Sequence, residues 1–155
     1  MSDSFEQNFR DILSPILNNL GFKRVKLKKI ICDEYLYNIG EIWFSLSWDY
    51  RDQYLDVSLG KMFWFKDVME RVVVIGDYSN YDEKITYSAM STLGSDIAIF
   101  EAIALSLKDA LKTYNEKYQE IYQDFRVSRS NRGGINIDEY IGAEVKLSDL
   151  QKFRA

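Results

Sequence analysis

Hydrophobic and polar residues recur with two different periods along the chain, and these periods predict where helices and strands lie. A capping pattern begins at Ser4, apolar residues follow at helical spacing, and Gly21 ends the run. We therefore expect one helix over residues 4–20, with a kink at Pro15. A longer run predicts a second helix over residues 95–125. Its apolar positions are separated by alternating steps of three and four residues: Ile97, Phe100, Ala104, Leu107, Leu111, Tyr114, Tyr118, Ile121 and Phe125.

Between the two helical runs the period falls to two, which is typical of strands with one buried face. The alternating runs predict strands over residues 22–31, 35–39, 42–49, 54–60 and 83–90. The clearest runs, 42–49 and 54–60, are joined by a short polar turn and predict an antiparallel hairpin. Residues 66–75 fit either a helix or a strand, because acidic residues that could open a helix precede four β-branched residues.

This order of elements predicts the α+β class. We expect an antiparallel sheet of about four to five strands, packed against an N-terminal helix and one long helix. The length of 155 residues suits a single domain with a substantial core. After Phe125 the composition changes, and Arg, Ser, Asn and Gly predict a mobile linker over residues 126–134. We expect one domain over residues 1–126 and a tail over residues 127–155 that docks partly on it.

The composition narrows the classes of function. The chain has no histidine and one cysteine, Cys32. Nucleophilic sites that need histidine are therefore excluded, a zinc site lacks ligands, and neither a P-loop nor a GxGxxG motif occurs. We expect a protein that is not an enzyme and has no cofactor.

Charge and hydropathy indicate a location and a kind of partner. The net charge of −4 argues against nucleic-acid binding and permits a basic partner. The single cysteine, the polar N-terminus and the absence of an apolar run of about 20 residues predict a cytoplasmic protein that does not bind membranes.

Acidic and aromatic residues gather around the predicted hairpin and are the candidate partner-binding residues: Glu41, Trp43, Asp49, Asp52, Tyr54 and Asp56. If Leu46 and Trp48 face the core, Trp43 points to the other face, where a tryptophan near acids is typical of an interface anchor. The alternative for Trp43 is packing under the long helix or the tail. The aspartates suit a basic partner, a magnesium ion or an ordinary solvated turn.

The layout also resembles a known family. The residues that carry the resemblance are Leu20-Gly21-Phe22 at the end of the first helix, followed by Ile42-Trp43-Phe44 and Asp56-Val57-Ser58-Leu59-Gly60 in the strands before a long helix. In these features, over about the first 60 residues, the chain resembles the small bacterial immunity proteins that protect cells from contact-delivered or polymorphic toxins. The resemblance implies a non-enzymatic, often acidic protein that occludes a toxin's active site. It assigns a role to no single residue.

Three functional hypotheses follow. The first is an immunity protein that neutralises a protein partner, such as a basic toxin domain, by direct occlusion. The second is a structural or adaptor subunit that forms a homodimer through the apolar stripe of helix 95–125. The third is a carboxylate-dependent metal enzyme that uses Asp49, Asp52 and Asp56.

Overall fold

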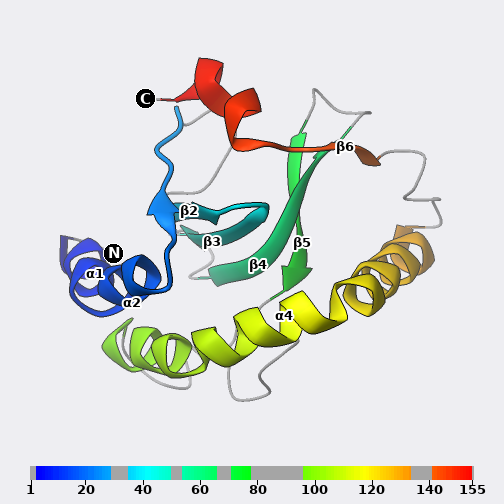
Figure 1. Cartoon of the computed structure of the whole chain (residues 1–155). Coiled ribbons are helices and arrows are strands. Elements are labelled where there is room, and N and C mark those ends of the chain that lie inside the picture. The colour runs from blue at the N-terminus through cyan, green and yellow to red at the C-terminus, as the bar shows by residue number, and fades with distance from the viewer. Residues whose placement is uncertain are drawn as a thin grey trace.

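The computed structural model describes residues 3–28, 35–49, 54–65, 71–77, 96–133 and 141–154. The elements in chain order are α1 (Asp3–Asn8), η1 (Phe9–Leu13), α2 (Ser14–Asn19), β1 (Lys23–Arg24), β2 (Tyr35–Ile39), β3 (Ile42–Asp49), β4 (Tyr54–Phe65), β5 (Arg71–Asp77), α4 (Asp96–Gly133), β6 (Ile141–Glu144) and η4 (Leu147–Phe153). An antiparallel sheet lies between the helices on one side and the C-terminal residues on the other (Figure 1). The predicted α+β class is confirmed.

The sheet has the strand order β1-β2-β3-β4-β5, and β6 also pairs with β4. The predicted hairpin is present, with Trp43 opposite Gly60, but β4 continues to Phe65 instead of ending at residue 60. Beyond Gly60, β5 occupies one edge of β4 and β6 the other, where Phe63 lies opposite Glu144. The strand β6 therefore continues the line of β3. Of the ambiguous residues 66–75, residues 71–75 form part of strand β5; the predicted strand 83–90 lies outside the described residues.

The N-terminal helix is continuous but changes its winding. A π-helical turn, η1, precedes Pro15, which lies at the start of α2. Proline lacks the backbone N–H and crowds the carbonyl four residues earlier, and both effects favour a wider turn before it. Gly21 ends the helix at φ +97°, and a Cβ added to it would lie 2.9 Å from Ile39 Cδ1. The backbone N–H groups of Gly21 and Phe22 donate to Asn18 and Leu17, as in a Schellman motif.

Each face of the sheet has its own hydrophobic core. The larger core lies between the sheet and the helices, with these fully buried side chains among its members: Phe9, Leu13, Leu17, Phe44, Leu46, Leu59, Phe100, Ile103 and Leu107. The smaller core lies on the opposite face and consists of Val25, Leu36, Trp43, Met62, Val145 and Leu150. We refer to residues 141–154 as the C-terminal segment, because they cover that second face together (Figure 1).

Helix α4 is longer than predicted and is kinked. It continues to Gly133, so residues 126–133 are helical where a linker was expected, and Lys117 has non-helical angles (φ −119°, ψ 22°). Most apolar residues on one side of α4, up to Tyr114, are buried in the larger core. Packing on the sheet therefore explains this apolar stripe without a partner helix. Ile97, by contrast, is 46% exposed. None of the described helices is both long and apolar enough to cross a membrane.

Candidate binding site beside the C-terminal segment

The structure corrects the expected position of Trp43. Its side chain does point away from the larger core, as the alternation predicts, but it is 0% exposed. The reason is that the C-terminal segment covers this face, where Val145 and Leu150 belong to the same cluster as Trp43. The indole Nε1 of Trp43 is buried and has no hydrogen-bond partner among the described residues. Trp43 is therefore a core residue and cannot contact a partner directly in this structure.

The other predicted site residues are divided between the two ends of the hairpin. At the far end, the backbone register places Asp49 opposite Tyr54 and Asp56 opposite Ser47, while Asp52 lies outside the described residues. Glu41 lies at the opposite end of β3, in the turn after β2. The five described residues of this set therefore do not form one cluster. Among the described residues, no group of three or more acids or cysteines is placed to hold a metal ion.

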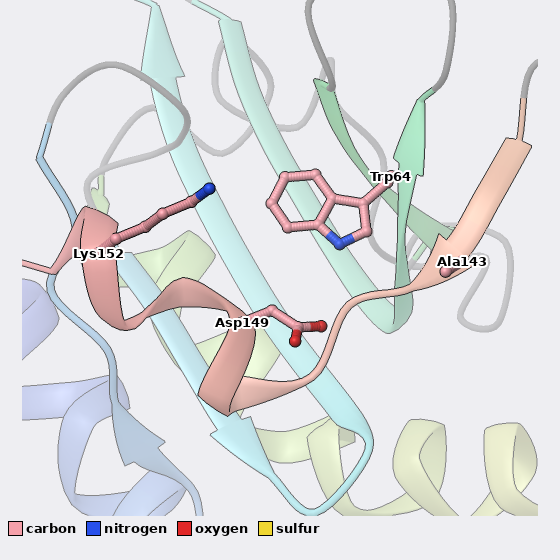
Figure 2. A pocket seen from close by; sticks show the side chains of 4 residues that line it. All are labelled: Trp64, Ala143, Asp149 and Lys152. Atoms are coloured by element: carbon pink, nitrogen blue, oxygen red, sulfur yellow. The ribbon is translucent and has the colours of Figure 1, made fainter.

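An open hollow lies between strand β4 and the C-terminal segment. It measures about 500 Å³ and is lined by Trp64, Ala143, Asp149 and Lys152. Figure 2 shows the Lys152 side chain and the six-membered ring of Trp64 directed toward each other, and the Asp149 carboxylate on the side of the indole nitrogen. Its volume lies in the range of about 300–1,000 Å³ that is usual for ligand pockets. Because three of its four lining residues belong to the C-terminal segment, the hollow forms only when that segment is docked.

The side chains around the hollow are held by local contacts. Asp149 Oδ2 accepts a hydrogen bond from the backbone N–H of Lys146 at 2.9 Å, and this bond fixes the start of η4. The ammonium of Lys152 lies 5.0 Å from the centre of the Phe153 ring, and that ring lies 6.3 Å from the ring of Trp64. Trp64 is partly buried, whereas Lys152, Asp149 and Ala143 are exposed. The hollow thus offers an aromatic wall with one fixed acid and one cation at its rim.

Lys61 joins the C-terminal segment to the rest of the sheet. Its ammonium lies 3.3 Å from Glu41 Oε2 and 3.3 Å from Glu144 Oε1, at the point where the start of β3 meets the end of β6. Glu144 Oε1 is buried and has no hydrogen-bond partner by distance and angle among the described residues, where the ion pair with Lys61 balances its charge. The same ammonium lies 4.5 Å from the ring centre of Tyr118 on α4. One side chain therefore contacts β6, the β2–β3 turn and the long helix.

The surroundings of Lys61 change two pKa values. Burial alone would lower the pKa of Lys61, but pairing with Glu144 and Glu41 outweighs it, and the net pKa lies above the ordinary value. Burial raises the pKa of Tyr118, and the nearby Lys61 ammonium offsets only part of this. Both shifts keep the groups protonated, with Lys61 charged and Tyr118 neutral. This arrangement suits a structural clamp, since a catalytic lysine base needs a lowered pKa.

The aromatic residue at the hollow could have been found from the sequence, whereas the other three could not. Met62 and Trp64 continue the alternation of β4 beyond Gly60, so extending the predicted strand would have placed both on the face of Trp43. The positions of Ala143, Asp149 and Lys152 depend on the docking of a segment whose apolar spacing is irregular. Comparisons with protein-family models, with curated proteins and with solved structures found no match to this chain.

Proposed function

We propose that this chain is a non-catalytic cytoplasmic binding protein that neutralises a protein partner by direct occlusion, in the manner of an immunity protein. The observation that supports the proposal best is the hollow at Trp64. Interface energy is concentrated in a few anchors, and tryptophan is among the commonest of them. A partly buried tryptophan at an open hollow, with exposed charged residues on its rim, has the character of such an anchor site.

Co-expression with the product of the adjacent gene tests the proposal. We expect that product to be harmful alone, and we expect the chain to restore growth and to co-purify with it. The variants Trp64→Ala, which removes the aromatic wall, and Ala143→Arg, which fills the hollow from an exposed position, should both weaken rescue. The control is Leu105→Ala, because Leu105 is 85% exposed on α4 and does not line the hollow. If the product of the adjacent gene is harmless alone, or forms no complex with this chain, the proposal is wrong.

A further inference from the structure

The fold brings two basic stretches of the sequence together beside the hollow. The backbone N–H of Lys28 donates to the carbonyl of Phe153 at 2.8 Å, and Leu27 forms an antiparallel bridge with Arg154. These contacts join residues 23–28 to the end of η4. We define the basic patch as the exposed cations of residues 26–28 and 146–154: Lys26, Lys28, Lys146, Lys152 and Arg154. This patch could not be predicted from the sequence, because more than a hundred residues separate its two parts.

Few acidic residues neutralise the positive charge of the basic patch. Asp149 is the one acid within residues 23–28 and 146–154, and it already accepts a hydrogen bond from the Lys146 backbone. None of the five cations forms an ion pair with another described residue. The two stretches of the patch therefore bring five exposed cations and one acid to this side of the sheet. The local charge is opposite to the net charge of −4 of the whole chain.

We infer that the hollow and the basic patch together receive an acidic segment of the partner protein, with one apolar or aromatic side chain against Trp64 and flanking carboxylates on the cations. This inference rests on the proposed function and replaces a basic partner with an acidic one at this surface. Complementary charge would speed association and fix the register of the segment. Trp64 is the one aromatic residue among the four that line the hollow, which suits one inserted side chain better than successive bases stacked on several rings. The net charge also opposes a long polyanion.

Model peptides test the chemistry without the partner. The probe is acetyl-Glu-Glu-Phe-Glu-Glu-amide, and the controls are the same peptide with lysine in place of glutamate and a single-stranded oligothymidylate. Binding is followed by the NMR shift of the Trp64 indole N–H, with the buried Trp43 indole as an internal reference. We expect only the acidic peptide to shift the Trp64 signal, and we expect added salt to weaken the binding of that peptide. Equal binding of the lysine peptide, or tighter binding of the oligonucleotide, would overturn the inference.

Charge-reversal variants test which cations take part. Lys152→Glu and Lys28→Glu should each weaken binding of the acidic peptide by about fivefold, since each removes one attraction and adds one repulsion at an exposed site. Lys112→Glu makes the same change in net charge at an exposed position on α4, outside the basic patch, and should leave the affinity unchanged. A similar loss in all three variants would mean that only net charge matters, and it would overturn the assigned site.

The two proposals can fail separately. If the partner binds and depends on Trp64 but the acidic peptide does not bind, the inferred chemistry is wrong while the proposed function stands. If the acidic peptide binds at Trp64 but the chain neither binds nor neutralises the product of the adjacent gene, the proposed function fails while the recognition of acidic segments remains.

Discussion

At the scale of single residues, Tyr114 connects the long helix to the sheet. Its hydroxyl accepts a hydrogen bond from the backbone N–H of Lys61 at 2.9 Å, and its side chain is 1% exposed. The bond lies where the β4–β5 register shifts, between Ser58 and Lys61. A backbone donor at such an irregularity needs a partner from outside the ladder, and α4 supplies it.

Replacing Tyr114 with Phe removes this acceptor and keeps the ring. We expect Tyr114→Phe to lower the free energy of unfolding by about 0.5–1.5 kcal/mol, the usual net contribution of one hydrogen bond, because the donor is only partly buried. Urea denaturation measures the change. Tyr122→Phe is the matched control, because Tyr122 is partly buried and the described contacts of its side chain involve the ring, stacked on Phe63 and Tyr118. A loss of similar size in both variants would argue against a specific role for the Tyr114 hydroxyl.

Lys61 and Tyr118 together predict how stability depends on alkaline pH. Both pKa values are raised in the folded state, from ordinary values of 10.5 and 10.0. A raised pKa means that the folded state holds its proton more tightly than the unfolded state does. The stabilisation is therefore complete below the ordinary value and is lost as the pH rises through the folded value.

We expect the unfolding free energy to decrease above about pH 10 and to decrease less steeply in the double variant Lys61→Met/Tyr118→Phe. Denaturation curves across this pH range measure the slope. Lys112→Met removes an exposed lysine and should retain the slope of the original protein. An unchanged slope in the double variant would show that neither group contributes to the alkaline loss.

At the scale of elements, the C-terminal segment is held by buried apolar side chains, by the ion pair of Glu144 with Lys61 and by a few backbone hydrogen bonds. Leu150 is 0% exposed in the smaller core, and the N–H of Val145 donates to Met62 at 2.8 Å. Leu147 lies on the same element, η4, but is 39% exposed. The two leucines therefore form a matched pair that differs in burial and not in chemistry.

Leu150→Ala should destabilise the docked segment by about 2–5 kcal/mol, because it leaves a cavity in a small core. Leu147→Ala should change stability by less than about 0.5 kcal/mol. Hydrogen exchange locates the effect. The amides of Val145 and Lys28 form hydrogen bonds that join the C-terminal segment to the rest of the protein, and they should exchange faster relative to amides near Leu107 in α4. Equal acceleration everywhere would indicate global unfolding and not local opening of the segment.

The sequence predicted elements where burial on one face imposes a regular period. Apolar residues alternate with period two in β3 and β4 and recur every three to four residues in α4. These elements could therefore be predicted from the sequence. The exposure of Trp43 could not be predicted in this way. Alternation separates the two faces of a strand, but whether the second face meets solvent depends on Val145 and Leu150, about a hundred residues further along. The hollow at Trp64 depends on the same distant docking.

At the scale of the whole molecule, one sheet serves two cores. Strands β2, β3 and β4 contribute alternate side chains to the helix side and to the side of the C-terminal segment. In β3, for example, Phe44 belongs to the larger core and Trp43 to the smaller one. Disturbing either layer therefore disturbs the strands on which the other layer packs. Lys61 adds a direct link, since it contacts both Glu144 of β6 and Tyr118 of α4.

This sharing predicts a single cooperative unfolding transition in which the C-terminal segment does not behave as a separate tail. In the variant Trp48→Phe/Trp64→Phe, Trp43 is the only tryptophan, and its fluorescence reports on the smaller core. Far-UV circular dichroism reports mainly on the helices, which pack on the other face. The two signals should change at the same urea concentration, because two-state unfolding gives coincident transitions for all probes. If fluorescence changed at lower urea, the C-terminal segment would undock first, and the hollow between it and β4 would be lost before the rest of the protein unfolds.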